Sequence, residues 1–233
     1  MNIIGTLMEK SKAIVLLSGG MDSLVTAAIA VMNNTETYFL HVNYGQRTEK
    51  RELLCFQKLV EHYHPAGSLI ADISYLKDIG GSSLTDFSLE VNSSGLKKFI
   101  PNTYVPFRNA HLLSIAASWG EVIGANSIYI GVVEEDSSGY PDCTIDFINS
   151  FSKAIDKGTK PETKIEIRTP VIHSYKSEIV KIGFRFKAPF ELSWSCYMND
   201  EVACGVCDSC RLRLKAFKEA GMKDPIAYAD GVR

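Results

Sequence analysis

Apolar and polar positions follow one another along this chain in two patterns, and the two patterns alternate over most of its length. Short apolar runs bounded by glycine or polar residues predict buried strands. Longer segments with apolar residues at helical spacing, such as residues 48–63, predict amphipathic helices. The predicted strands are Ala13–Leu17, Thr37–Val42, Ser68–Ile73, Ser127–Val133 and Lys164–Thr169, the last with the alternation of an edge strand. The predicted helices are Asp22–Met32, Thr48–Tyr63, Arg108–Gly124, Phe147–Lys157, one that starts at Ser177–Gly183, and a basic helix at about Cys207–Ala220.

Repeated strand-then-helix units predict an α/β fold in which helices cover both faces of a doubly wound parallel sheet. Two regions interrupt the alternation. Residues Tyr75–Tyr104 lack sustained periodicity, and long loops of this kind are functional lids or disordered inserts. A cysteine-rich segment follows Lys187. We therefore predict one α/β domain over residues 1–187 and a small metal-binding segment over residues 188–233, packed on the same domain.

Composition narrows the classes of partner. The 233 residues are 45% hydrophobic and 22% charged, which is an ordinary globular balance. Lys plus Arg total 25 and Asp plus Glu total 27, so the net charge is −2. A protein whose main task is to grip a phosphate backbone usually carries a surplus of positive charge, so we predict no nucleic-acid partner.

The N-terminus and the cysteines indicate the compartment. No apolar run approaches the roughly 20 residues of a membrane-spanning helix, and Met1–Lys12 lacks the long apolar core of a signal peptide. We therefore predict a cytoplasmic protein with no membrane partner. Thiols stay reduced in the cytoplasm, and four of the six cysteines lie within Cys196–Cys210. That crowding favours a metal site over disulfides.

The four clustered cysteines have the spacing of a structural zinc site. Cys196, Cys204, Cys207 and Cys210 form C-x7-C-x2-C-x2-C, with two overlapping C-x2-C pairs. Zinc favours four thiolates in a tetrahedron, and four protein ligands leave no position for a catalytic water. Nearby backbone N–H groups can stabilise the thiolates. Disulfides and an iron–sulfur cluster remain the alternatives.

The turn after the first predicted strand has the features of a phosphate-binding loop. It reads Ser18-Gly19-Gly20-Met21-Asp22-Ser23 and leads into a helix. Glycines let the backbone approach a ligand closely, and N–H groups at a helix start favour anions. Asp22 can hold a magnesium ion that bridges phosphates. The loop is neither a Walker A sequence nor a dinucleotide fingerprint. The alternative is an ordinary strand–helix turn in which Asp22 or Ser18 caps the helix.

The loop resembles the pyrophosphate loop of the N-type ATP pyrophosphatases, or PP-loop superfamily, with an adenine-nucleotide-hydrolase-like fold. Further segments resemble one family within it, 7-cyano-7-deazaguanine synthase of the queuosine pathway, over roughly residues 13–228. They are Tyr44-Gly45-Gln46-Arg47, residues 101–109 (PNTYVPFRN), residues 139–143 (GYPDC), residues 194–197 (WSCY), residues 204–210 (CGVCDSC), and Arg211 with Arg213.

The resemblance implies an ATP-dependent carbon–nitrogen ligase. The family converts 7-carboxy-7-deazaguanine and ammonia to the nitrile through adenylated acid and amide intermediates, and it forms homodimers. The cofactors implied are Mg²⁺ with ATP and structural Zn²⁺. Transferred to this sequence, the ATP-binding residues are Leu17, Ser18, Gly19, Gly20, Met21, Asp22 and Ser23. The catalytic residues are Asp22, Lys176 and Arg108, and the substrate-binding residues are Arg108, Asn109, Asp136, Tyr140 and Asp142.

For several of these residues the sequence leaves two roles open. Arg108 starts a helix after a proline turn and can present its guanidinium to a carboxylate or phosphate, or it lies on the helix surface. Asp142 follows the fourth strand, where ligands of open α/β sheets bind, or it stabilises a turn. Asp136 competes with Asp142 for the same role, and Lys176 is either near the phosphates or solvated. Ser137 departs from the family, which often has an aromatic residue there.

Other residues with reactive side chains favour structural interpretations. We predict that His41 is a pocket-edge or core residue rather than a base, and that Cys55 is core packing. Cys143 lines the pocket or acts covalently, and we favour packing. Arg211, Arg213, Lys215 and Lys218 are explained by a solvated helix face.

Rival functions remain open at this point. One is another PP-loop amide-forming or tRNA-modifying enzyme, and the net charge of −2 and the absence of an extra domain disfavour a tRNA-modifying enzyme. A relative that stops at the amide is not separated by motifs. A non-enzymatic zinc-binding adaptor explains the four cysteines but not the loop.

Overall fold

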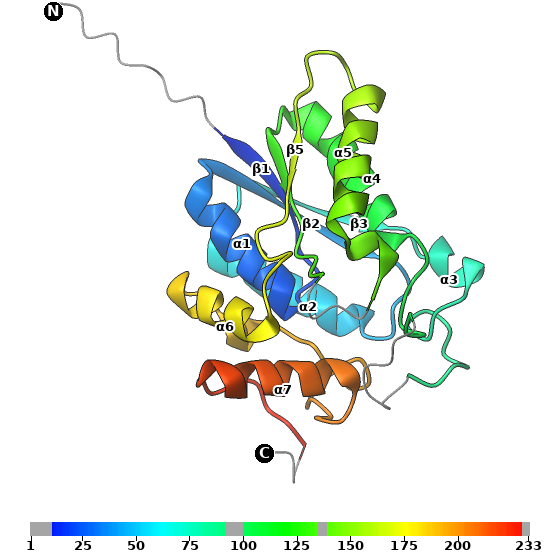
Figure 1. Cartoon of the computed structure of the whole chain (residues 1–233), viewed down its shortest axis with the longest axis vertical. Helices are drawn as coiled ribbons and strands as arrows, with labels where there is room; N and C mark the ends of the chain where they lie inside the picture. The colour runs from blue at the N-terminus through cyan, green and yellow to red at the C-terminus, as the bar shows by residue number, and fades with distance from the viewer. Residues whose placement is uncertain (1–10, 92–99, 135–138, 230–233) are drawn as a thin grey trace, which may run out of the picture.

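The computed structural model describes residues 11–91, 100–134 and 139–229, and a five-stranded parallel sheet lies at its centre (Figure 1). The strands are β1 (Lys12–Leu16), β2 (Glu36–Asn43), β3 (Gly67–Asp72), β4 (Ser127–Tyr129) and β5 (Glu166–Arg168), in the order β3-β2-β1-β4-β5. In the register of the central strand, Val15 pairs with Phe39 on one side and with Tyr129 on the other. The doubly wound parallel sheet is confirmed, with β5 at an edge as its alternation predicts.

Helices cover both faces of the sheet, because side chains along each buried strand point alternately to the two faces. Ala13 and Val15 of β1 belong to one apolar core, and Ile14 and Leu16 belong to the other. The first core packs against α1 (Met21–Asn33), α2 (Glu49–Tyr63), α6 (Lys176–Arg185) and α7 (Asp208–Ala220). The second packs against α3 (Tyr75–Ile79), α4 (Arg108–Ile123) and α5 (Ile145–Gly158) (Figure 1). Short 3₁₀ turns lie at η1 (Pro141–Cys143) and η2 (Phe190–Leu192).

The strand order reverses at β1, and this reversal positions the site. The chain runs outward from β1 to β2 and β3, then returns to the other side of β1 for β4 and β5. The loops that leave β1 and β4 therefore diverge at the carboxyl end of the sheet, where open α/β sheets bind their ligands.

The fourth strand is shorter than its apolar run predicts. The run Ser127–Val133 forms ladder pairs only over Ser127–Tyr129, although Ile130 and Val133 remain buried. At Gly131 the chain passes against the start of α1, since a Cβ there would lie 2.8 Å from the Asp22 carbonyl oxygen. Residues 130–133 therefore leave the sheet and form part of the cavity wall.

The aperiodic region Tyr75–Tyr104 begins with a short helix, α3, that its sequence did not predict. Arg47 ties the following loop in place: its guanidinium donates to the carbonyl oxygens of Ser83, Asp86 and Leu89. Because Arg47 binds three backbone carbonyl groups of this loop, the Tyr44–Arg47 motif has a structural role in holding the loop close to the connection between β2 and α2. Residues 92–99 lie outside the described residues.

The C-terminal segment shares the first core with the rest of the chain, through Phe190, Ala216 and Phe217. The prediction of a solvated basic face on α7 is wrong for Arg213, whose side chain is 1% exposed. Its Nε and Nη2 donate to the two carboxylate oxygens of Asp224 at 2.8 and 3.0 Å, and Nη1 donates to Ser193 Oγ at 2.8 Å. A bidentate carboxylate and further acceptors compensate for the loss of water around the guanidinium.

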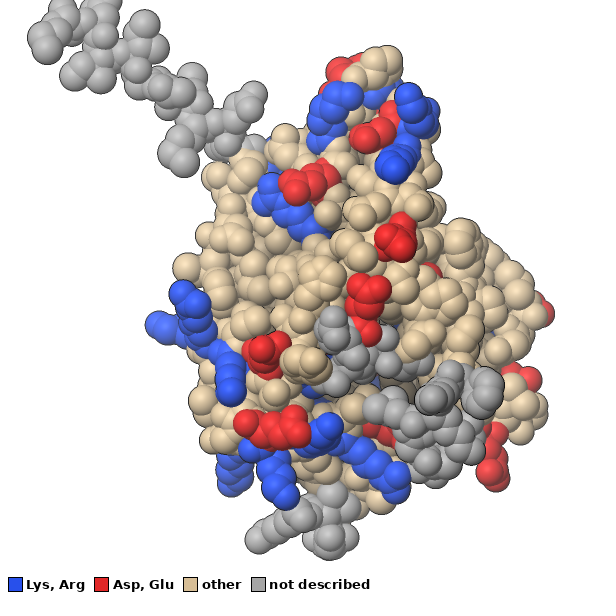
Figure 2. All heavy atoms as spheres, in the orientation of Figure 1, with Lys and Arg blue, Asp and Glu red and all other residues tan. Residues whose placement is uncertain are grey.

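Within the described ranges, no helix is both long and apolar enough to cross a membrane. On the face shown in Figure 2, lysines and arginines are interspersed with acidic residues, and basic side chains gather both at the end of the molecule near α5 and near α6 and α7.

Candidate active site

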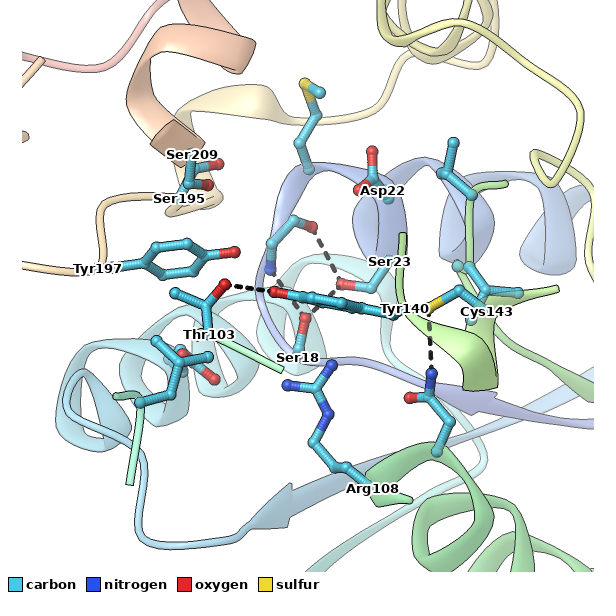
Figure 3. Close-up of a pocket in the computed structure, with 18 of the residues that line it drawn as sticks. Ser18, Asp22, Ser23, Thr103, Arg108, Tyr140, Cys143, Ser195, Tyr197 and Ser209 are labelled. Atoms are coloured by element: carbon cyan, nitrogen blue, oxygen red, sulfur yellow. Dashed lines mark hydrogen bonds between the residues drawn. The ribbon is translucent and has the colours of Figure 1, made fainter. Parts of the chain in front are cut away.

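A cavity of about 630 Å³ opens at the carboxyl end of the sheet. That volume lies within the roughly 300–1,000 Å³ usual for small-molecule sites. Its described walls come from the loop after β1, the ends of β2 and β4, the first turns of α2, α4 and α6, and the C-terminal segment. Figure 3 shows side chains from these separate parts of the chain around one space.

The loop after β1 forms one wall. Ser18 Oγ lies 3.1 Å from Ser23 Oγ and accepts a hydrogen bond from Gly20 N at 3.2 Å, while Ser23 Oγ donates to Gly20 O at 3.0 Å (Figure 3). Gly20 is the N-cap of α1, and no side chain caps this helix. The alternative that Ser18 or Asp22 caps the helix is therefore wrong. The uncapped N–H groups of the first turn suit an anion.

Two glycines allow the close packing that shapes the loop. Gly19 has φ +85°, and a Cβ there would lie 2.7 Å from the Cβ of Cys55 and 3.1 Å from the carbonyl oxygen of Glu52. Gly131, from the end of β4, leaves no room for a Cβ against the backbone of Asp22 and Ser23. Both sites require a glycine because backbone and helix atoms already occupy the space.

Asp22, in the first turn of α1, and Lys176, in the first turn of α6, form an ion pair in the cavity wall. Lys176 Nζ donates to Asp22 Oδ2, and both side chains are largely buried. Asp22 Oδ1 is buried and has no hydrogen-bond partner in the described part of the chain. A buried carboxylate oxygen without a partner is costly, and a divalent cation is the kind of ligand that satisfies it. The donor set therefore fits the Mg²⁺ that ATP carries. Lys176 lines the cavity, so the alternative of a solvated lysine is wrong.

Arg108 and Tyr44 form the opposite wall. Arg108 is the first residue of α4, and its Nη1 donates to the Tyr44 hydroxyl at 3.0 Å while the guanidinium lies 5.1 Å from the centre of the Tyr44 ring. Arg108 Nε is buried with no partner among the described residues. Arg108 thus faces the cavity (Figure 3), not the helix surface, and retains hydrogen-bonding capacity for a ligand.

Asp142 occupies a different environment from the one predicted. Its side chain is 2% exposed, and Oδ2 accepts a hydrogen bond from Asn109 N at 2.9 Å. Asn109 Nδ2 in turn donates to Asp142 O at 3.0 Å. Asp142 is not among the described residues that line the cavity, whereas Asn109 is. These contacts support the turn-stabilising alternative, in which Asp142 holds the start of α4. Asp136 and Ser137 lie outside the described residues.

Tyr140 and Cys143 line the same wall. The Tyr140 hydroxyl lies 2.7 Å from Thr103 Oγ1, and its ring packs against Tyr104 at 5.6 Å between centroids (Figure 3). Burial raises the pKa of the Cys143 thiol to about 12. A thiol that stays protonated at neutral pH is a poor nucleophile, which supports packing over covalent catalysis.

His41 and Cys55 are core residues, as predicted. His41 is 1% exposed; its Nδ1 lies 3.0 Å from Leu17 O and its Nε2 lies 3.0 Å from Asn43 Oδ1. Burial lowers the pKa of His41, so the ring is neutral. Cys55 is buried beside Trp194 and the cysteine cluster.

The four predicted ligand cysteines come together. The Sγ atoms of Cys196, Cys204, Cys207 and Cys210 all lie within 4.8 Å of one another, an arrangement that can hold a metal ion. Backbone N–H groups of Met198, Asn199 and Cys204 donate to Cys196 Sγ at 3.3–3.4 Å, and Cys207 N donates to Cys204 Sγ at 3.4 Å. Such N–H groups favour thiolates, so the donor set fits a thiophilic metal.

The cysteine cluster is connected directly to the phosphate loop. Trp194 N donates to Gly19 O at 2.9 Å, and the Arg51 guanidinium lies 4.2 Å from the centre of the Trp194 ring. Ser195, Cys196 and Tyr197 continue along the cavity wall. The cysteine-rich segment therefore forms part of the cavity wall.

Sequence reasoning missed several cavity residues. Tyr44, Glu52, Tyr197, Asp208 and Ser209 all line the cavity, and none was assigned to it. Four of these residues lie inside the motif segments of the sequence, which could therefore have identified them as site residues: Tyr44, Tyr197, Asp208 and Ser209. Glu52 lies five residues after the Tyr44–Arg47 motif and reads as one polar position of an amphipathic helix.

The parallel sheet, its reversal at β1 and the Ser-Gly-Gly-x-Asp-Ser loop define the PP-loop class of ATP-using folds. In agreement, the chain superposes with a TM-score of 0.52 and 18% identity on a solved 4-thiouridine synthetase in complex with RNA and bound ATP, covering 91% of this chain and 50% of that one. At that identity the likeness concerns the fold alone.

A family model described as "Queuosine biosynthesis protein QueC" matches residues 12–221, and the chain belongs to this family. Its relatives include a 7-cyano-7-deazaguanine synthase from Chloroherpeton thalassium, 58% identical over 93% of this chain and 96% of that protein. Another from Nautilia profundicola is 55% identical over 93% of this chain and 98% of that protein. Family membership favours an ATP-dependent ligase over the tRNA-modifying and adaptor alternatives.

Proposed function

We propose that this chain converts 7-carboxy-7-deazaguanine and ammonia to 7-cyano-7-deazaguanine with consumption of ATP. The observation that carries the proposal is one cavity that joins a pyrophosphate-type loop to a wall bearing Arg108, in a chain 55–58% identical to proteins named for this activity. The loop suits the ATP phosphates and the opposite wall suits a planar, carboxylate-bearing base.

The chemistry accounts for both walls. A carboxylate is a poor electrophile, so one of its oxygens must first become a leaving group as an acyl-adenylate. Ammonia then displaces AMP to give the amide. A second adenylation, on the amide oxygen, lets AMP depart as the C≡N bond forms. Each step shifts negative charge on phosphate, which fixed donors stabilise best where water is excluded.

The residues divide between the two substrates. Ser18 and Ser23 hydroxyls and the first N–H groups of α1 bind phosphate, with Leu17 beside them, and Lys176 faces the same region. Arg108, Asn109 and Tyr140 bind the deazaguanine acid on the other wall. The Asp142 carboxylate stabilises the start of α4 by accepting a hydrogen bond from Asn109 N, and the Asn109 side chain is held separately by the backbone oxygen of Asp142.

Two metal ions have different tasks. Asp22 holds Mg²⁺, which neutralises charge on the ATP phosphates when bound. The four cysteines hold Zn²⁺, whose task is structural because four thiolates complete its coordination. In this proposal residues 188–233 are a zinc-binding segment on the α/β domain of residues 1–187.

The cellular setting follows from the same chemistry. A reduced tetrathiolate site and an ATP-consuming reaction suit the cytoplasm. A homodimer, which the family resemblance implies, is tested by light scattering of the purified protein. We retain the prediction that nucleic acid is not a partner, because the net charge of the chain is −2 and a protein that grips a phosphate backbone usually carries a surplus of positive charge.

The test is incubation of the purified protein with ATP, Mg²⁺, ammonium and 7-carboxy-7-deazaguanine. Mass spectrometry is expected to show the nitrile, and chromatography AMP and pyrophosphate. ADP as the main nucleotide product would contradict the proposal, and amide that never becomes nitrile would restrict it to the first half of the reaction.

A further inference from the structure

Glu52 is an acidic residue in the cavity that neither the loop nor the predicted substrate wall uses. It lies in the first turn of α2 and lines the cavity together with Thr48 and Tyr44. Its backbone packs against Gly19 of the phosphate loop, where a Cβ would come within 3.1 Å of its carbonyl oxygen. Glu52 therefore lies between the phosphate loop and the Arg108–Tyr44 wall.

The Glu52 carboxyl is held in place by one hydrogen bond on each oxygen. Thr48 Oγ1 donates to Oε1 at 2.9 Å, and Gln46 Nε2 donates to Oε2 at 3.1 Å. The Gln46 amide is itself fixed, since its Oε1 accepts from Tyr44 N at 2.9 Å. Each carboxylate oxygen has a second lone pair, so the group is oriented and retains the capacity to accept a proton from a ligand.

The proposed reaction releases protons from nitrogen. In the first step the nitrogen of ammonia bonds to the acyl carbon, AMP leaves with the electron pair of the C–O bond, and one proton departs from nitrogen. In the second, the amide oxygen displaces pyrophosphate from ATP and the amide nitrogen loses a proton. When AMP leaves, the last N–H electron pair becomes the third C–N bond and the final proton departs. A base in the cavity is required for each.

Other titratable groups around the cavity suit this task less well. No histidine lines the cavity in the described part of the chain. Burial raises the pKa of Tyr44 and of Cys143 to about 12, so neither is an anion at neutral pH. Asp22 is paired with Lys176, and Asp208 directly follows Cys207 of the cysteine cluster. Among the described residues that line the cavity, Glu52 is the remaining oriented carboxyl.

We propose that Glu52 is the general base that accepts the protons released from nitrogen during amide and nitrile formation and passes them to solvent between steps. This proposal rests on the proposed function. It adds a role that the phosphate loop and the Arg108 wall do not supply, and it explains why Gln46 of the Tyr44–Arg47 motif and the next residue but one, Thr48, both donate to one carboxyl.

The surroundings of Glu52 give it a suitable proton affinity. Burial raises the pKa of its carboxyl to about 7, partly offset by the hydrogen bonds from Thr48 and Gln46. The charged neighbours are Arg108 from α4, which lowers the pKa, and Glu49 from the same helix, which raises it. A base is most effective when its pKa lies near the working pH.

The experiment separates adenylation from the steps that release nitrogen-bound protons. Exchange of labelled pyrophosphate into ATP, with 7-carboxy-7-deazaguanine and no ammonia, reports acyl-adenylate formation. If the wild-type protein shows no exchange, the proposed function fails rather than the role of Glu52. In Glu52→Gln we expect exchange to be largely retained and amide formation to fall by about 100-fold or more. Glu61→Gln, an exposed position on the same helix, is the matched control and should behave as wild type.

The pH profile provides a readout that a structural role would not move. Started from the amide, the second half of the reaction needs no ammonia, so its pH dependence reports a group on the protein or its ligands. Because a base acts when deprotonated, the wild-type rate should rise through about pH 7 and then level off. Glu52→Asp should keep this rise, and Glu52→Gln should lose it. An equal loss of exchange and amide formation in Glu52→Gln, or an unchanged pH profile, would overturn the proposal.

Discussion

The phosphate loop and the C-terminal wall line the same cavity but depend on the sequence in different ways. The loop is six consecutive residues, Ser18–Ser23, that follow β1 and run into the first turn of α1, so local geometry and two close-packed glycines determine its shape. The C-terminal wall, residues 194–213, depends on contacts between residues far apart in the sequence: the Arg213–Asp224 pair, the backbone hydrogen bond from Trp194 N to Gly19 O, and the four clustered thiols. The wall should therefore lose its structure when a single side chain is removed, whereas the loop should lose chemistry without losing structure.

Removal of the metal should give the largest effect. We expect about one zinc per chain, and we expect Cys207→Ser to lose it and to unfold the segment from Trp194 onward, since zinc binding is coupled to folding. Elemental analysis and hydrogen exchange measure the two effects. Cys55→Ser changes a buried thiol beside the cluster that is not a ligand, and it should keep the metal. A brown protein containing iron and sulfide would contradict the zinc assignment.

Loss of the buried ion pair should come next. Arg213→Met leaves Asp224 buried without its partner, so the free energy of unfolding should fall by about 3–5 kcal/mol. Denaturant titration measures this change. Lys215→Met, on the exposed part of the same helix, should change stability by less than about 1 kcal/mol. Equal effects in the two variants would show that Arg213 does not hold the wall.

Asp22→Asn tests the other half of the comparison. If Asp22 holds the metal of ATP, turnover should fall by about 100-fold or more, near 3 kcal/mol in activation free energy, with a smaller loss of stability than in Arg213→Met because the Asp22–Lys176 pair is less buried. Asp146→Asn in the first turn of α5 is an exposed acidic control. Near-normal turnover in Asp22→Asn would remove Asp22 from the catalytic residues.

The smallest effect should come from Asp142→Ala. Loss of the acceptor for Asn109 N should lower stability by about 1 kcal/mol, as for other helix-start acceptors, and should change substrate affinity little. Asp142→Asn keeps one acceptor and should lie between this variant and wild type. If instead the acid substrate binds roughly 5- to 150-fold more weakly and ATP binding is intact, Asp142 contacts the substrate directly, as the sequence alone predicted.

The parts predicted well from sequence are those with local determinants. The sheet, the flanking helices and the cysteine cluster follow from periodicity and spacing, because each depends on residues a few positions apart. The Ser18–Ser23 loop was placed at the start of α1 for the same reason.

The parts predicted poorly depend on long-range contacts. Arg213 has the sequence context of a solvated helix residue, and only Asp224 and Ser193, brought close by the fold, make it a core residue. Asp142 follows a strand, as a ligand-binding residue does, but its Oδ2 accepts a hydrogen bond from Asn109 N and it is not among the described residues that line the cavity. Glu52 has the periodicity of a surface position, yet α2 turns it toward the cavity.

The central claim is that one cavity activates both oxygens of the carboxylate in turn by adenylation. The most direct test is the reaction of 7-carboxy-7-deazaguanine labelled with ¹⁸O in the carboxyl group, with mass spectrometry of the AMP and nitrile formed. The account predicts two AMP molecules for each nitrile, with one carboxyl oxygen transferred to each of them. Unlabelled AMP, or label found in phosphate released with ADP, would contradict it.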